Sequence, residues 1–266
     1  MGYYRPPGEY LRQWRQRRRM SQLELALEAD ISARHLSFVE TGRAQPSRDM
    51  IVHLAETLAV PLRERNAILL AGGFAPLYAE RPLDDPALSA ARAAVDAVLQ
   101  GCAPFPALAV DRRWNIVAFN AGVSAVLGGV APELLAAPNA MRLALHPQAL
   151  APRILNFGEW RAHLLARVRQ QIAASGDAGL EQLLAELIAY SYPENADLAA
   201  HEERAGGEPA IVVPLRLRDG DARLSFISTI TVFGTPVDVT LSELAIETFF
   251  PADAATSDFL RAKAAG

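Results

Sequence analysis

Polar and basic side chains recur at helical spacing between residues 32 and 43 of this 266-residue chain. Arg34 and Arg43 carry guanidinium groups, and Ser37 and Thr41 carry hydroxyls. Such groups bind phosphate oxygens and the edges of nucleic-acid bases, and the bidentate arginine–guanine pair is the commonest specific contact of this kind. The segment therefore has the chemistry of a DNA-reading surface, provided that one helix presents these side chains together.

Two short helices with matching caps are predicted around these residues. Ser21 can cap a helix over residues 22–29, and Glu24 at its third position completes a capping box. Ser32 can cap a second helix that stops at Gly42, a residue suited to the left-handed position after a helix. Two short helices joined by a tight turn form a helix-turn-helix, whose second helix enters the major groove. An ordinary helical hairpin with a polar outer face is the alternative interpretation.

Apolar positions and flanking segments support the helix-turn-helix. The inward positions are Leu25, Ala26, Ala29, Ile31, Leu36 and Val39. A basic helix is predicted over residues 10–19, and two further helices over residues 48–58 and 62–71. We therefore expect a compact five-helix domain.

Charge is unevenly divided along the chain. Residues 1–72 hold eleven Arg against eight Asp or Glu, whereas the remainder holds fifteen basic and twenty-two acidic residues. This asymmetry favours a nucleic-acid-binding N-terminal part, although the arginines at 17–19 could equally form a solvated surface.

Several function classes are excluded by what the sequence lacks. No run of about eighteen apolar residues predicts a membrane span, and the N-terminus lacks the apolar core of a signal peptide. A single cysteine, Cys102, permits neither an internal disulfide nor a CxxC pair. Residues 122–126 begin like a nucleophile elbow, but Val126 replaces the second glycine. We expect a cytoplasmic bacterial protein with no catalytic residues, bound metal or cofactor.

The remaining sequence predicts a second, α+β domain after a proline-containing linker at residues 74–86. A connecting helix is expected over residues 88–100, then a hairpin with strands at 107–110 and 114–120. Helices are expected at 121–127, 132–136, 158–174 and 178–190, and strands at 211–218, 223–233 and 244–250. A strand pair, a helical middle and a terminal antiparallel meander give a PAS-like outline.

Two families share these motifs. Residues 9–72 resemble the XRE family of phage-repressor-like regulators. Residues 106–120, His146-Pro147, Asn156-Phe157 and the helix at 160–167 look like the MmyB-like ligand-binding domain. The resemblance implies a multidomain protein, with a five-helix helix-turn-helix domain at 1–73, the linker at 74–86 and a PAS-like α+β domain at 87–266.

The XRE resemblance also implies roles for residues around the second motif helix. The implied DNA-contacting set is Gln22, Ser32, Ala33, Arg34, Ser37, Phe38, Thr41 and Arg43. Ala33, Arg34 and Phe38 sit where that family reads bases. The residues implied to lie near phosphates are Gln22, Ser37, Thr41 and Arg43. That family often has amides at the first base-reading positions, so a guanine contact by Arg34 is our own hypothesis. Glu40 is expected to pair with Arg15.

The MmyB-like resemblance implies a transcriptional regulator, with a fatty-acid-type ligand for some members. We expect an apolar pocket for an acyl chain, with walls from Trp114, Phe119, Phe157, Trp160, Leu164, Phe226 and Phe249. Arg142, His146 or Asn156 could anchor a carboxylate, and Arg142 is preferred because guanidinium pairs with carboxylate bidentately.

Alternatives for the second domain stay open at this stage. It could serve only to dimerise or to bind a protein partner. It could also hold haem or flavin, and His146 and His163 are the candidate haem ligands. We expect a homodimer joined through residues 87–266, with the strand at 223–233 as a candidate interface. Such a dimer would bind a near-palindromic double-stranded DNA operator.

Overall fold

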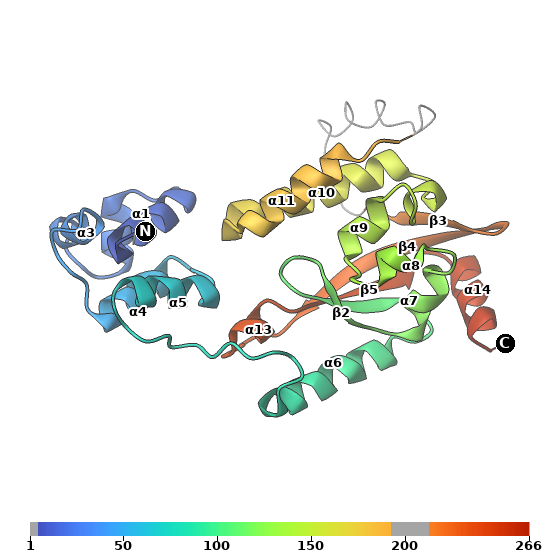
Figure 1. The fold of residues 1–266 in the computed structure, drawn as a ribbon, viewed down its shortest axis with the longest axis horizontal. Helices are drawn as coiled ribbons and strands as arrows, with labels where there is room; N and C mark the ends of the chain where they lie inside the picture. Colours follow the sequence, from blue (N-terminus) through green and yellow to red (C-terminus); the bar gives the residue numbers. More distant parts are fainter. Residues whose placement is uncertain (1–4, 193–212, 266) are drawn as a thin grey trace. The chain divides into compact units, whose positions relative to one another are not determined.

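The computed structural model describes residues 5–192 and 213–265, which divide into two compact units. The first contains residues up to Pro82 together with the short segments Ala173–Ser175 and Thr235–Ser242, and the second contains the remaining residues (Figure 1). Each unit has its own hydrophobic core. Within the described residues, no helix combines the length and apolar character needed to cross a membrane.

The first unit contains the five predicted helices. They are α1 (Pro7–Arg17), α2 (Gln22–Glu28), α3 (Ala33–Glu40), α4 (Arg48–Thr57) and α5 (Leu62–Ala71), and the unit also holds the one-turn helix α13 (Val239–Ser242). Their shared core is fully buried and includes Leu11, Leu25, Leu36, Ile51, Leu54, Ile68 and Leu69. The helix-turn-helix prediction is confirmed, with α2 and α3 as its two helices.

Local sequence signals define the ends of these helices. The Ser21 hydroxyl accepts a hydrogen bond from the Glu24 amide at 3.1 Å, and the Ser21 amide donates to the Glu24 carboxylate at 2.6 Å. This capping box satisfies two otherwise unpaired amides of α2. The Ser32 hydroxyl caps α3 by accepting a hydrogen bond from the His35 amide at 3.1 Å. Gly42 follows that helix with φ of +72°, a conformation that glycine adopts without steric cost.

A curled antiparallel sheet of five strands forms the framework of the second unit. The strands are β1 (Ala107–Val110), β2 (Ile116–Phe119), β3 (Leu215–Asp219), β4 (Ala222–Val232) and β5 (Ala245–Pro251). Their order across the sheet is β2-β1-β5-β4-β3. The last strand in sequence therefore lies at the centre, where Ala107 of β1 pairs with Thr248 of β5.

Helices cover both faces of this sheet (Figure 1). One face packs against α6 (Ser89–Gly101), and the other lies under a helical layer that contributes most of the larger core. That layer comprises α7 (Ala121–Val126), α8 (Pro132–Leu135), α9 (Ala140–Leu145), α10 (Phe157–Ser175) and α11 (Ala178–Ala189). Leu108 and Val110 of β1 point into the larger core, whereas Ala107 and Ala109 point toward α6, as strand alternation requires.

Three details of this unit differ from the predictions. Trp114 does not lie in a strand: it has φ of +68° in the turn before β2, and its side chain is buried. Helices α9 and α14 (Ala254–Ala265) were not predicted, and short 3-10 turns at Pro86–Leu88 and Ala151–Arg153 add to the connections. The predicted strand at 211–218 begins at Leu215 in the structure, and its first two residues lie outside the described part of the chain.

Candidate functional site

Helix α3 presents the residues proposed to read DNA. Arg34, Thr41 and Arg43 are exposed, and Ser37 is partly exposed on the same helix. The Arg34 guanidinium lies over the Phe38 ring, 5.4 Å from its centroid, and this stacking restricts a long side chain that would otherwise be flexible. The Thr41 hydroxyl donates to the Ser37 carbonyl at 2.7 Å, which leaves its oxygen able to accept.

A buried ion pair holds α1 and α3 together behind this surface. Arg15 donates from Nε and Nη2 to the two carboxylate oxygens of Glu40, at 2.6 and 2.8 Å. Hydrogen bonding to Glu40 raises the pKa of the Arg15 guanidinium above its ordinary value. Gln22 donates its amide to the same carboxylate at 2.7 Å. The Arg15–Glu40 pair that the resemblance implied is therefore confirmed, and Gln22 is oriented by it at the start of α2.

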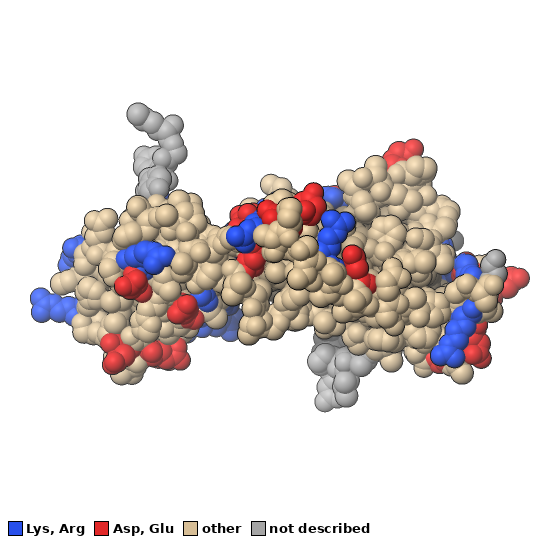
Figure 2. Space-filling model, turned by 90° about the horizontal axis from the view of Figure 1, so that it is seen from below, with Lys and Arg blue, Asp and Glu red and all other residues tan. Residues whose placement is uncertain are grey.

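Charge around the DNA-binding unit is mixed rather than uniform. On the face seen in Figure 2, basic and acidic side chains lie in small neighbouring groups at the end that contains α1 to α5. The charges on this face therefore form no broad positive field.

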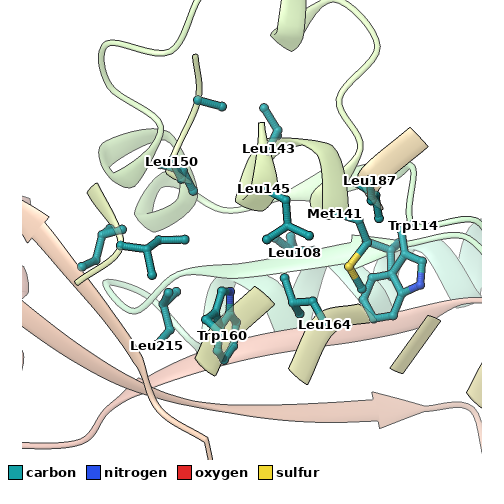
Figure 3. Packing of buried hydrophobic residues seen from close by; sticks show 14 of the residues in the cluster. Leu108, Trp114, Met141, Leu143, Leu145, Leu150, Trp160, Leu164, Leu187 and Leu215 are labelled. Carbon is teal, nitrogen blue, oxygen red and sulfur yellow. The ribbon is translucent and has the colours of Figure 1, made fainter. Parts of the chain in front are cut away.

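The second unit contains an apolar cavity of about 80 Å³ between the sheet and its helical layer. Nineteen residues line it, and Glu247 is the single ionisable one among these described residues. The lining comprises Pro106, Leu108, Trp114, Ile116, Val123, Val126, Leu127, Ala140, Met141, Leu143, Ala144, Leu150, Ile154, Trp160, Leu164, Leu215, Phe226, Glu247 and Phe249. Figure 3 shows Trp160 and Leu164 of α10 opposite Leu143 and Leu145 of α9, with Leu108 between them.

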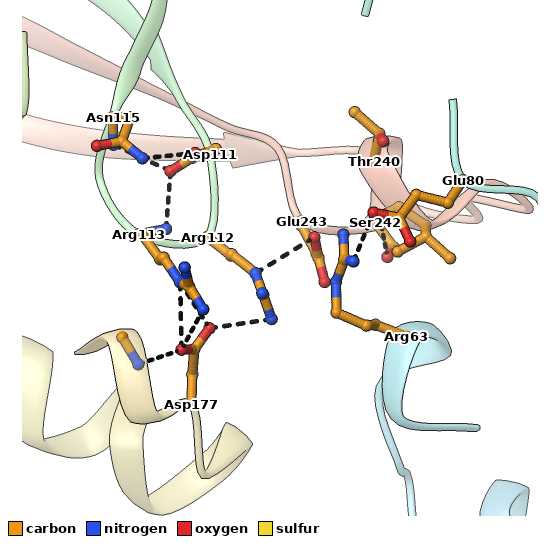
Figure 4. A network of polar contacts seen from close by, with 12 residues as sticks. Arg63, Glu80, Asp111, Arg112, Arg113, Asn115, Asp177, Thr240, Ser242 and Glu243 are labelled. Carbon is orange, nitrogen blue, oxygen red and sulfur yellow. Dashed lines mark hydrogen bonds and ion pairs between the residues drawn. The ribbon is translucent and has the colours of Figure 1, made fainter. Parts of the chain in front are cut away.

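A polar network fixes the turn that delivers Trp114 to this cavity (Figure 4). Arg112 and Arg113, which precede Trp114, both bind the Asp177 carboxylate at the start of α11, at 2.9 and 3.1 Å. Burial opposes ionisation of Asp177, but hydrogen bonds from Arg113 and from the Gly179 amide outweigh it, so the pKa of Asp177 lies below its ordinary value. The turn is thus tied to the helical layer.

Two residues of α10 contact the Trp114 side chain. Its indole Nε1 donates to the side-chain oxygen of Gln171 at 2.6 Å, and the Arg167 guanidinium lies 4.6 Å from its ring centroid. Arg167 also donates to Glu247 at 2.8 Å, and only 15% and 5% of these two side chains are exposed. The Glu247 carboxylate, which lines the cavity, is therefore already paired with Arg167, which does not line it.

The ten residues proposed for ligand binding do not all meet at this cavity. Five of them line it: Trp114, Trp160, Leu164, Phe226 and Phe249. Phe119 is 48% exposed and borders a separate surface hollow, and Phe157 packs against Tyr192 at 4.7 Å between ring centroids.

The three proposed anchors lie outside the lining and have partners of their own. Arg142 forms a bidentate pair with Glu186, with both hydrogen bonds at 2.8 Å, so the two guanidinium donors that would bind a ligand carboxylate are already used. His146 accepts from the Gln148 amide and packs edge-on against Tyr190. Asn156 bridges α10 to β3 through the Pro214 carbonyl and the Arg216 amide.

Sequence reasoning missed most of the lining. Two signals were present: alternation along β1 places Leu108 on the cavity face, and Glu247 is the one carboxylate within the apolar stretch of β5. The other missed residues come from α7, α9, connecting segments and the strands β2 and β3, which contribute Ile116 and Leu215. The approach of these segments to one another depends on the tertiary fold.

Two family models match the sequence. The MmyB-like transcription regulator ligand binding domain matches residues 91–262, and a helix-turn-helix model matches residues 11–65. The chain belongs to the MmyB-like family. No curated protein matches the sequence. In this MmyB-like protein the first match coincides with the unit that holds the apolar cavity, and the second covers α2 and α3.

Together the two matches describe a ligand-responsive transcriptional regulator that binds DNA through an XRE-type helix-turn-helix. Both are regulator domains, and neither is an enzyme family.

Proposed function

We propose that this MmyB-like regulator senses a small apolar molecule, of the class of fatty acids and acyl derivatives, and changes its operator affinity in response. One observation carries the proposal: a cavity whose lining is apolar apart from one paired carboxylate. Ligand sites are typically apolar cavities with few polar groups, and the family match assigns ligand binding to this domain.

The size of the cavity means that a long acyl chain could bind only if the domain repacked. Pockets for small molecules commonly measure about 300–1,000 Å³, whereas this cavity measures about 80 Å³. A longer acyl chain therefore requires the surrounding side chains to move, among them the flexible Met141. Binding that repacks a domain favours one arrangement over another, which is the condition for a ligand to shift a conformational equilibrium.

The direct test uses protein purified under mild conditions and examined by native mass spectrometry. An operator selected from random DNA is then titrated with and without fatty acids and acyl thioesters. We expect bound lipid and an operator affinity that changes roughly 5- to 150-fold, the range of typical allosteric coupling. No bound lipid, no binding and unchanged operator affinity across the panel would refute the sensing proposal.

A matched pair of variants locates the effect. Ala144 lines the cavity, so Ala144→Leu fills it, whereas Ala121→Leu adds the same volume at an exposed position. The first variant should weaken ligand binding and the operator response, and the second should leave both unchanged.

For the DNA-binding unit we propose that Arg34 reads a base, with Ala33 and Phe38 beside it at the base edges. The phosphate-contacting residues in this proposal are Gln22, Ser37, Thr41 and Arg43, and Ser32, which caps α3, completes the proposed DNA-contacting set. Their exposure on and around α3 supports these roles, because the second helix of the motif is the one that enters the major groove.

A second candidate function is dimerisation or protein binding alone, favoured by the apolar residues exposed on β4. Ile227, Ile230 and Val232 are 38%, 52% and 64% exposed, and the pairing with β3 ends at Phe226. We propose that this strand contributes to a homodimer interface, whether or not the cavity binds a ligand. The haem alternative finds less support, because neither His146 nor His163 lines the cavity; His201 lies outside the described residues.

A further inference from the structure

One buried hydrogen-bond donor in the cavity wall has no partner in the protein. Trp160 is 2% exposed and lines the cavity, and its indole Nε1 makes no hydrogen bond within the described part of the chain. Figure 3 shows this nitrogen on the side of the ring toward Leu108 and Leu145. Buried tryptophans usually find an acceptor, as Trp114 does in Gln171 at the same cavity. An unmet buried donor is costly, which makes this position one where a ligand acceptor would add binding energy.

The charges around the cavity select the kind of acceptor. No basic residue lines it among the described residues, and the one acidic lining residue, Glu247, is a carboxylate. Arg167, the nearest cation to that carboxylate, is paired with it. A second carboxylate brought inside by a ligand would meet a like charge, and burying an unpaired charge is far more costly than burying a neutral carbonyl.

The histidine beside Trp160 does not supply a cation. His163 stacks on the indole at 5.4 Å between ring centroids, and burial, with a contribution from Arg167, lowers its pKa below the ordinary value. The lowered pKa favours the neutral imidazole at this position.

We propose that Trp160 Nε1 donates a hydrogen bond to a neutral carbonyl of the ligand, so that the cavity takes acyl esters, thioesters, amides or lactones in preference to free fatty acids. The inference rests on the proposed sensing function and narrows its ligand class. It assigns Trp160 a binding role besides its place in the core. The free guanidinium nitrogen of Arg167, which is buried and unpartnered, is the competing anchor and would favour a free acid instead.

The test compares three probes of similar length on the full-length protein by titration calorimetry: methyl octanoate, octanoate and nonane. We expect the ester to bind at least tenfold more tightly than the free acid. In Trp160→Phe, ester binding should weaken about five- to tenfold, the loss expected for one hydrogen bond, while nonane binding stays within about twofold. The ester should also shift the indole N–H resonance of Trp160 downfield in the unmodified protein, and nonane should not.

The outcomes separate the two proposals. Equal binding of all three probes, with no effect of Trp160→Phe, overturns the role of Trp160 but leaves the apolar sensor intact. Tighter binding of octanoate that is lost in Arg167→Gln replaces Trp160 with Arg167 as the anchor. Failure of every probe to bind overturns the sensing function itself. The comparison of probes on the unmodified protein decides the question even if the variant fails to fold.

Discussion

Removing the carboxylate of Glu40 should destabilise the DNA-binding unit more than any loss of a surface ion pair. The Glu40 side chain has no exposed surface, and Arg15 is 10% exposed. Glu40 accepts two hydrogen bonds from Arg15 and one from Gln22. Glu40→Ala leaves a guanidinium buried without its counter-charge, a change that typically costs about 3–5 kcal/mol. Small domains are stable by only about 5–15 kcal/mol, so the loss would be a large fraction of the total stability.

Hydrogen-exchange mass spectrometry on the full-length protein measures this loss within residues 7–71. The slowest amides there should exchange about a hundred- to several-thousand-fold faster in Glu40→Ala, since each 1.4 kcal/mol is a factor of ten. Glu28→Ala, at an exposed position on α2, is the matched control and should change little. The double variant Arg15→Met, Glu40→Leu removes both charges and should recover much of the stability. Exchange in Glu40→Ala that matches the Glu28→Ala control would refute the view that this pair stabilises α1 against α3.

Three further predictions concern DNA reading by α3, the Asp177 carboxylate and the assembly of the protein. Arg34→Ala should reduce the binding free energy for the selected operator by about 1–3 kcal/mol and remove the sequence preference at one base pair. Arg43→Ala should weaken binding to all DNA sequences alike and reduce the salt dependence of binding. Fluorescence anisotropy at several salt concentrations distinguishes the two variants. The pKa of Asp177 is lower in the folded protein than in the unfolded chain, where it is about 4. The ionised carboxylate therefore stabilises the fold above that pH, and this stabilisation is lost as the pH falls below it. Asp177→Asn should reduce the stability at neutral pH and make the stability decline less steeply in acid, as measured by thermal unfolding between pH 3 and 7. Light scattering should give the mass of a homodimer, and Ile230→Lys should shift it toward the monomer; a monomer that footprints only a half-site would contradict the assembly proposed here.

The DNA-binding unit could be predicted from the sequence because its signals are local. The capping box of Ser21 and Glu24 spans four residues, and Gly42 directly follows the helix that it ends. Short-range hydrogen bonds of this kind require no knowledge of the rest of the fold. The one distant contact that was expected, between Arg15 and Glu40, came from family resemblance and not from the pattern of residues.

The ligand cavity could be predicted only in outline, because its wall depends on contacts between distant segments. Arg142 has the right chemistry for a carboxylate anchor, yet Glu186 on another helix already occupies its fork. Trp114 follows an apolar strand in sequence, but the turn that contains it is tied to the start of α11 by the salt bridges of Arg112 and Arg113 to Asp177. Neither partner is implied by the residues around it in the sequence.

The central position of β5 has a consequence for the order in which the protein is made. Ala107 of β1 pairs with Thr248 of β5, so the ligand-binding sheet closes only after nearly the whole chain has left the ribosome. Helices α1 to α5 make close-range contacts with one another and can fold much earlier during synthesis. A chain interrupted before β5 would therefore carry a folded DNA-binding unit without a completed sensor. Such a fragment could present α3 to DNA but could not respond to a ligand.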